Sequence, residues 1–196
     1  GTKIIVFYPK GGVSRVQELQ MVTQKGENTS VVAIHGNFDN AQSGVKAIFE
    51  DKELAAELDA KGYQFSSANS INIGRLVPQV VYYVYAYAKL LENEEIQAGE
   101  EINVTVPTGN FGNILAAYYA KQMGVPIAKL ICASNDNKVL FDFFQTGVYD
   151  RNREFILTSS PSMDILISSN LERLIYTIAG QDAQKDTELM TQLKEK

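Results

Sequence analysis

The chain has 196 residues, 45% hydrophobic and 21% charged, a composition typical of a globular protein with one large domain or two small ones. Its net charge of −5 argues against a general nucleic-acid binder but leaves small anionic ligands open, because backbone N–H groups bind these. A single cysteine, Cys132, and a single histidine, His35, exclude a disulfide framework and a cysteine- or histidine-rich metal site. We expect neither a membrane span nor a signal peptide, and therefore a cytoplasmic protein.

Short apolar runs alternate with helical patterns along the whole chain. The apolar runs predict strands at residues 3–8, 30–35, 63–68, 101–106 and 127–133, and a short strand or an extended segment at residues 154–159. Apolar spacing and capping residues predict helices within residues 15–25, 36–51, 52–62, 72–92, 112–124, 137–147, 168–180 and 182–196. Pro78 lies inside the longest of these helices, where it predicts a kink or a late start.

Strands that alternate with helices in this way indicate parallel sheets covered by helices on both faces, so the predicted fold class is α/β. The polar stretch at residues 66–74 predicts a boundary between a first unit, residues 1–68, and a second unit, residues 69–196. The chain also opens almost at once on a predicted core strand with no initiating methionine. We therefore expect it to be a piece of a longer protein.

A glycine- and asparagine-rich loop joins the strand at residues 101–106 to the helix that follows. It consists of Gly109, Asn110, Phe111, Gly112 and Asn113. Ligands of parallel α/β sheets bind beyond the carboxyl ends of strands, and a helix N-terminus with close-approaching glycines suits a phosphate. The spacing matches neither the dinucleotide-binding GxGxxG motif nor a Walker loop. Local chemistry favours phosphate binding over an ordinary turn and leaves the ligand open.

Other polar stretches are less specific. Asn72 and Arg75 follow the strand predicted at residues 63–68, where Arg75 could grip a substrate phosphate or carboxylate, or could equally be a solvated surface charge. Residues 158–170 carry Asp164 among serines, and for them a plain loop is the favoured reading. Residues 8–14, with Lys10 beside two glycines, also read as a turn before a capped helix.

Taken together, these segments resemble threonine synthases, which are pyridoxal-phosphate enzymes of the tryptophan synthase β-like fold. The resemblance covers nearly the whole length and keeps the family's order. It is carried by YPKGGVSRVQELQM, AIHGNFDNAQSGVK, SANSINIGRLVPQ, PTGNFGNILAAYYAKQMG and PSMDILISSNLERL. Related enzymes of the same fold, such as serine and threonine dehydratases, match mainly at the glycine-rich loop.

The resemblance implies a carbon–oxygen lyase that converts O-phosphohomoserine and water to threonine and phosphate. It implies that Gly109, Asn110, Phe111, Gly112 and Asn113 hold the phosphate of pyridoxal phosphate. It also places Asn72 and Arg75 on the substrate side. Residues 1–68 would then be the remainder of the family's small domain, and residues 69–196 the start of its large, cofactor-binding domain.

The chain departs from the family pattern at the catalytic lysine. The lysine that forms a Schiff base with the cofactor lies in a Phe-Lys-Asp motif, and that motif does not occur in this sequence. Lys10, Lys46 and Lys121 lie in predicted turns or helices without this context. We therefore expect the lysine upstream of Gly1, a central fragment that is inactive alone, and association between copies through exposed apolar surface.

Two other functions compete with this interpretation. A nucleotide-binding oxidoreductase domain could use the same loop, although it would lack GxGxxG and an acidic residue at the expected distance to hold a ribose. A non-catalytic module that binds a phosphate ligand would predict anion binding without chemistry. Neither requires a metal.

Overall fold

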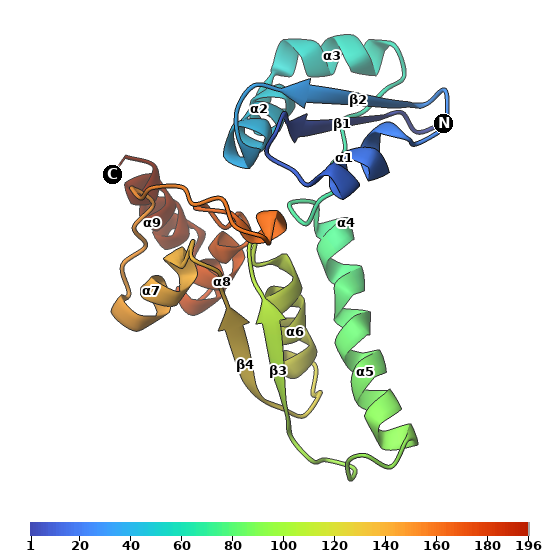
Figure 1. Cartoon of the computed structure of the whole chain (residues 1–196). Helices are drawn as coiled ribbons and strands as arrows, with labels where there is room; N and C mark the ends of the chain where they lie inside the picture. Colours follow the sequence, from blue (N-terminus) through green and yellow to red (C-terminus); the bar gives the residue numbers. More distant parts are fainter. Residues whose placement is uncertain (196) are drawn as a thin grey trace. The chain divides into compact units, whose positions relative to one another are not determined.

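The computed structural model describes residues 1–195, which fold as two compact units (Figure 1). Residues 1–66 together with Ile156–Ile165 form the first unit. Residues 67–155 and the chain from Leu166 onward form the second. Each unit holds one two-stranded parallel sheet, as expected where a helix connects the first strand to the second.

The first unit is a β-α-β crossover followed by two further helices. Its elements are β1 (Ile4–Pro9), α1 (Arg15–Val22), β2 (Thr29–Ile34), α2 (Phe38–Glu50) and α3 (Lys52–Ala60). Capping boxes at Ser14 and Asn37 satisfy the first N–H groups of α1 and α2. The returning segment contains the short 3₁₀ helix η2 (Pro161–Met163). There Asp164, 1% exposed, accepts hydrogen bonds from the backbone N–H and hydroxyl of Thr158.

The second unit begins with helices and then forms the β-α-β crossover that carries the candidate loop. Its elements are α4 (Ile73–Leu76), η1 (Val77–Gln79), α5 (Val80–Glu92), β3 (Ile102–Pro107), α6 (Gly112–Gln122), β4 (Ile127–Ala133), α7 (Val139–Thr146), α8 (Leu171–Ile178) and α9 (Ala183–Glu195). Strands β3 and β4 are parallel neighbours, with α6 as the connection between them (Figure 1).

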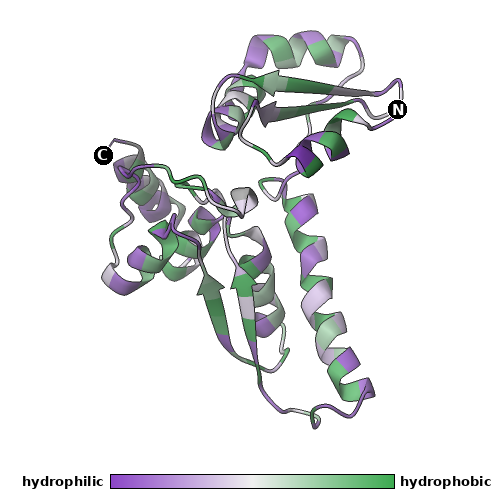
Figure 2. Ribbon diagram, in the orientation of Figure 1, coloured by the Kyte–Doolittle hydropathy of each residue, from purple (hydrophilic) through white to green (hydrophobic). Residues whose placement is uncertain are grey.

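The core of the second unit surrounds the first turns of α6. Many residues of β3, β4 and the helices beside them are apolar (Figure 2). The buried cluster consists of Leu76, Val106, Phe111, Ile114, Leu115, Leu140 and Leu171, with Leu76 and Leu115 fully buried. Burying a leucine side chain contributes about 1.5–3 kcal/mol. Packing against several elements thus fixes the first turn of α6, and with it the end of the loop that leads into this helix.

The α/β class and the parallel pairing of strands are confirmed, but the strand predicted at residues 63–68 is wrong, and of the two alternatives for residues 154–159 the strand is not formed. Residues 63–68 and 154–159 have no strand partner within the described chain. In the second case the N–H of Thr158, which a strand would use in a ladder, donates to the Asp164 carboxylate instead. The late start predicted from Pro78 is confirmed, since η1 contains this proline and α5 begins at Val80.

Candidate functional site

The loop of residues 109–113 leaves the carboxyl end of β3 and enters α6. The N–H of Thr108 still donates to the carbonyl of Ala133 at 2.8 Å, so the hydrogen bonds between β3 and β4 continue to that residue. The Thr108 hydroxyl turns back onto the Val106 carbonyl at 2.7 Å. The loop therefore begins at a rigid edge of the sheet, the place where parallel α/β proteins bind ligands.

Phe111, the residue before α6, has a left-handed backbone conformation with φ 64° and ψ 0°. This conformation costs a residue other than glycine about 1 kcal/mol, and here a buried ring compensates. The ring is 5% exposed and its centroid lies 6.1 Å from that of Phe144. A left-handed residue followed by a right-handed helix turns successive N–H groups toward one side, which forms an anion-binding nest.

The N–H groups around this nest are available to a ligand. Within residues 1–195, the backbone N–H groups of residues 109–114 have no hydrogen-bond acceptor. They lie at the N-terminus of α6, where the helix dipole adds a partial positive charge. The geometry therefore suits a small anion such as a phosphate.

Gly112 lets a neighbouring segment pack directly against the loop. A Cβ at this position would lie 2.6 Å from both Cβ and Oγ of Ser70, which is closer than side chains approach one another. The segment before α4 thus lies against the first turn of α6. The candidate substrate residues follow this contact directly, with Asn72 at the N-cap of α4 and Arg75 within α4.

The carbonyl groups of the loop are bound by the segment that precedes α8. Ser168 donates its hydroxyl to the Gly109 carbonyl at 2.5 Å. The backbone N–H of Asn170 and its side-chain Nδ2 donate to the Asn110 carbonyl at 3.1 and 2.9 Å. The Ser169 hydroxyl donates to the Asn110 side chain at 3.0 Å. Residues 168–170 therefore bind the loop on the side of its carbonyl oxygens.

The side chain of Asn113 is engaged by the helices before β3. Its Oδ1 lies 2.5 Å from the hydroxyl of Tyr83, and its Nδ2 donates to Gln79 at 3.0 Å. Burial raises the pKa of the Tyr83 hydroxyl, so this group stays a neutral donor. Asn113 thus offers the nest a backbone N–H, while its amide joins α6 to α5 and η1.

Asn72 and Arg75 lie at α4, in the same unit as the loop. Asn72 caps this short helix by accepting from the N–H of Gly74 at 2.9 Å. Arg75 is exposed, and its Nε donates to the Ala68 carbonyl at 2.8 Å. Among the described residues, nothing pairs with its two Nη groups. Its Nε is therefore held by a hydrogen bond, while its two Nη groups remain available to a ligand.

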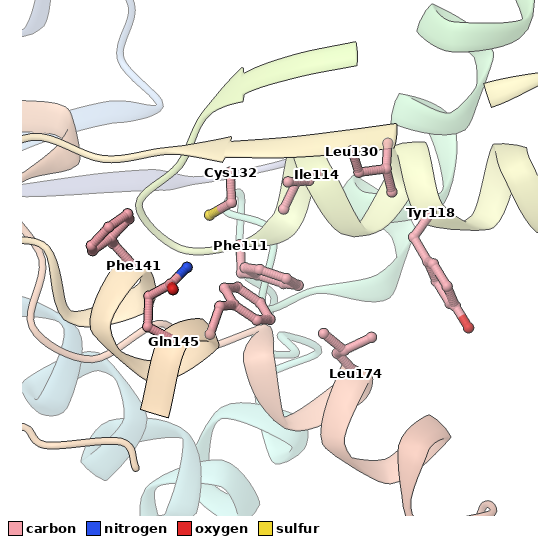
Figure 3. A pocket seen from close by; sticks show the side chains of 9 residues that line it. Phe111, Ile114, Tyr118, Leu130, Cys132, Phe141, Gln145 and Leu174 are labelled. Atoms are coloured by element: carbon pink, nitrogen blue, oxygen red, sulfur yellow. The ribbon is translucent and has the colours of Figure 1, made fainter. Parts of the chain in front are cut away.

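An apolar pocket of about 320 Å³ opens beside Phe111. Figure 3 shows the rings of Phe111 and the neighbouring side chains around it. Its lining residues are Phe111, Ile114, Tyr118, Leu130, Cys132, Phe141, Phe144, Gln145 and Leu174. Burial raises the pKa of the Cys132 thiol, which disfavours the reactive thiolate. Because Phe111 lines the pocket and caps α6, it connects the pocket to the loop.

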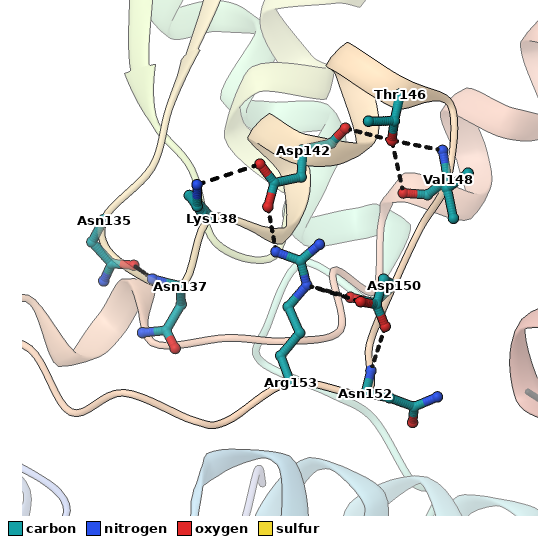
Figure 4. A network of polar contacts seen from close by, with 9 residues as sticks. All are labelled: Asn135, Asn137, Lys138, Asp142, Thr146, Val148, Asp150, Asn152 and Arg153. Atoms are coloured by element: carbon teal, nitrogen blue, oxygen red, sulfur yellow. Dashed lines mark hydrogen bonds and ion pairs between the residues drawn. The ribbon is translucent and has the colours of Figure 1, made fainter.

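A charged network follows β4 and stabilises α7 and the loop after it (Figure 4). Arg153 donates to the Asp142 carboxylate, and Lys138 lies 3.7 Å from the same group. Arg153 also donates through Nε to the Asp150 carbonyl at 2.9 Å. The hydrogen bond from Arg153 lowers the pKa of the Asp142 carboxyl. The charged groups of this cluster pair with one another, which indicates a structural role rather than a catalytic one.

Sequence reasoning missed Ser168, Asn170 and Arg173, because it favoured a plain loop for residues 158–170. In the structure the first two bind the candidate loop. Arg173 donates to the Asn170 side chain and to the carbonyls of Ser70 and Ile71. The signal available in the sequence was a serine–serine–asparagine run directly before a helix that contains an arginine.

Two classes of site find no support in the described part of the chain. Residues 1–195 contain no cluster of three or more histidine, cysteine, aspartate or glutamate side chains that could hold a metal ion. Of the helices described, none has the length and apolar character needed to cross a membrane.

Comparison with known proteins identifies relatives along nearly the whole chain. No protein-family model matches it. The chain is 50% identical over 193 residues to "Threonine synthase-like 1" of Macaca fascicularis, which covers 97% of this chain and 26% of that protein. It is 44% identical over 184 residues to the threonine synthase of Eremothecium gossypii, covering 93% of this chain and 34% of that enzyme.

Solved structures show the same relationship. The crystal structure of threonine synthase with bound pyridoxal phosphate from Brucella melitensis aligns with a TM-score of 0.81 at 44% identity, over 98% of this chain and 39% of that one. The resemblance to threonine synthases is therefore confirmed, and the chain shares their fold over the aligned part. It spans between about a quarter and two fifths of the length of these relatives.

We predict that Gly112→Ala lowers the free energy of unfolding by about 1–3 kcal/mol, because the new Cβ collides with Ser70. Ser70→Gly removes the colliding side chain and should recover part of this loss. The double variant should therefore lose less free energy of unfolding than the sum of the losses of the two single variants. Urea denaturation measures all three. The control is Gly44→Ala in α2, where a Cβ meets nothing within 4 Å and stability should rise by up to about 1 kcal/mol. Strict additivity at 112 and 70 would contradict the predicted contact.

We also predict a pH-dependent effect of Arg153→Gln. A carboxyl whose pKa is lowered by folding adds stability above its unfolded pKa, and this stability is lost as the pH falls through the aspartate range. The variant should therefore be less stable than the wild type at about pH 7 and equal to it at about pH 2. Urea titrations at both pH values measure this difference.

Lys61→Gln serves as the control for Arg153→Gln. It breaks the Lys61–Glu57 ion pair on α3, whose side chains are 60% and 62% exposed, so its effect should be small at either pH. A deficit of Arg153→Gln that is the same at both pH values would show that the stability does not come from the Asp142 charge.

Proposed function

We propose that this chain supplies the cofactor-phosphate cradle, and part of the substrate site, to a pyridoxal-phosphate-dependent threonine synthase. The observation that carries the proposal is the nest at residues 109–113, which offers unpaired N–H groups at a helix N-terminus. The reaction proposed is the conversion of O-phosphohomoserine and water to threonine and phosphate, a carbon–oxygen lyase reaction of threonine biosynthesis. We propose the cytoplasm as its compartment.

The residues present fit a phosphate group. The side chains that hydrogen-bond to the loop are serine, asparagine, tyrosine and glutamine, so no negative charge opposes an anion there. Arg173 reaches the loop through Asn170 and adds a positive charge behind it. An overall charge of −5 therefore does not prevent this part of the surface from attracting an anion.

In this proposal the N–H groups of residues 109–113 hold the cofactor phosphate and so fix the position of the cofactor ring. When bound, the cofactor supplies an electron sink for the protons that leave the substrate. Asn72 and Arg75 bind the substrate, because the free Nη groups of Arg75 form a fork that matches a phosphate or carboxylate. The Nε contact of Arg75 to Ala68 directs that fork.

The complete reaction needs more than these residues. The sequence contains no lysine in the Phe-Lys-Asp context of the family, and the chain spans 26–39% of the length of its relatives. We infer that the active enzyme is a longer polypeptide that includes this chain, and that residues 1–196 alone bind the cofactor phosphate without turning over substrate.

Asn110→Asp should weaken binding of pyridoxal phosphate to the chain by at least about tenfold, because a carboxylate beside the nest repels the phosphate. The variant keeps the oxygen that accepts the Ser169 hydroxyl, so the loop retains this contact. The control is Gln122→Glu, which makes the same charge change at the opposite end of α6 and should leave affinity within about twofold.

Isothermal titration calorimetry with pyridoxal phosphate, and with pyridoxal lacking the phosphate, measures both effects. The wild-type chain should prefer the phosphorylated compound. Equal affinity for the two compounds would show that the loop does not recognise a phosphate.

A longer polypeptide that joins this chain to the family's lysine motif should acquire visible absorbance with pyridoxal phosphate. It should also release inorganic phosphate from O-phosphohomoserine and form threonine, whereas residues 1–196 alone should release none. Arg75→Gln in the longer protein should raise KM more than it lowers kcat, because it removes a substrate contact. A colourless and inactive longer protein would contradict the threonine synthase assignment and favour a module that only binds a phosphate ligand.

A further inference from the structure

Asn170 occupies the N-cap position of α8 but does not cap that helix. Its side chain makes no hydrogen bond to the N–H groups of α8, although asparagine at an N-cap commonly does so. The residue is fully buried, and its amide contacts other segments of the chain. Nδ2 donates to the Asn110 carbonyl at 2.9 Å and to the Ser70 hydroxyl at 2.8 Å. The oxygen Oδ1, which would cap α8, accepts from the side chain of Arg173 instead, while Nδ2 donates to the loop. A buried side chain with this contact is a candidate for a role in the loop.

The hydrogen-bond network determines which way the Asn170 amide faces. Arg173 can only donate, and it donates to Oδ1. The Asn110 carbonyl can only accept, so it requires Nδ2. These two neighbours permit a single orientation of the amide. Arg173 is held in turn by the Ile71 carbonyl, which accepts its Nη2 at 2.8 Å.

Binding a carbonyl oxygen also orients the N–H on the other side of the same peptide bond. The described chain has no cis peptide bonds, and in a trans peptide the C=O of one residue points opposite to the N–H of the next. The Asn110 carbonyl faces Asn170, so the N–H of Phe111 points away from Asn170. By the same argument, the bond from Ser168 to the Gly109 carbonyl turns the N–H of Asn110 away from Ser168.

The loop would not keep these directions by itself. Gly109 and Gly112 allow a wide range of backbone angles, and Phe111 already has a left-handed conformation. If a peptide plane rotated, a carbonyl oxygen would replace an N–H on the anion side, and its partial negative charge would oppose the ligand. The hydrogen bonds from residues 168–170 prevent this rotation.

We propose that Asn170 is a positioning residue of the phosphate cradle, which holds the Asn110 carbonyl and thereby aims the Phe111 N–H at the bound anion. Ser168 does the same for the Asn110 N–H through the Gly109 carbonyl. This inference rests on the proposed function, since it requires that the loop bind a phosphate. In this proposal, residues some 60 positions away in the sequence determine the direction of individual N–H groups of the loop.

The test follows the amide signals of the loop in ¹H–¹⁵N NMR spectra of the full chain during titration with inorganic phosphate and with pyridoxal phosphate. In the wild type, the amides of residues 110–113 should shift in a saturable way. In Asn170→Ala, phosphate affinity should fall about tenfold, as expected for one lost hydrogen bond to a charged ligand. The Phe111 amide should respond more weakly than in the wild type, because only the backbone N–H of residue 170 still holds the Asn110 carbonyl, while the Asn113 amide responds as before.

Two further variants separate positioning from general support of the fold. Ser70→Ala removes the other acceptor of Asn170 Nδ2 but leaves the Asn110 carbonyl bound, so its phosphate affinity should stay within about twofold of the wild type. Ser168→Ala removes only the bond to Gly109, so the Asn110 amide should lose its response and the Phe111 amide should keep it. Urea denaturation of each variant checks that the chain remains folded. If Asn170→Ala does not fold, the residue-specific response of Ser168→Ala decides.

The possible results distinguish the two proposals. If the wild-type loop amides shift with neither probe, both the cradle and its positioning residues are overturned. If the wild type binds and Asn170→Ala gives the same affinity and the same Phe111 response, only the positioning role is overturned. Equal losses in Ser70→Ala and Asn170→Ala would also overturn it, because the effect would then follow packing rather than the Asn110 carbonyl.

Discussion

The hydrogen bonds that hold the Gly109 and Asn110 carbonyls determine what the loop can bind. A glycine-rich loop before a helix has many accessible shapes, and only some of them place N–H groups together on one side. Here the segment before α8 binds the carbonyl side and leaves the N–H side open. Three other features are consistent with that one arrangement: the left-handed conformation of Phe111, the buried start of α6 and the absence of a side chain at position 112.

The same arrangement explains how an acidic chain can present an anion site. The net charge of −5 is a property of the whole surface, whereas the loop is surrounded by uncharged hydrogen-bonding groups and backed by Arg173. Short-range interactions with aligned N–H dipoles outweigh a diffuse charge that salt screens over about 10 Å. Net charge therefore argues against a general nucleic-acid binder but does not argue against a small phosphate ligand.

Much of this could be predicted from the sequence, because the signals were local. The strands β1, β2, β3 and β4, the late start of α5 and the placement of the loop before α6 follow from patterns of a few neighbouring residues. At residues 154–159 the sequence left a strand and an extended segment open, and the strand does not form because a side chain from outside the run, Asp164, accepts from the N–H of Thr158. Asn170 was missed for a similar reason. Nothing next to it in the sequence shows that its Nδ2 donates to Asn110, or that its Oδ1 leaves the backbone N–H groups of α8 uncapped.

The loop residues and Asn170 are 60 positions apart, and Ser70 and Asn170 are 100 apart. Forming contacts over such distances costs loop-closure entropy, because long stretches of chain must be ordered, whereas helices and the β3-α6-β4 crossover depend on nearer neighbours. A chain that had its helices and sheets but not these contacts would lack the geometry of the loop. Binding of an anion at residues 109–113 would then report on completed tertiary structure, and ligand would stabilise the fully folded state over any state without these contacts.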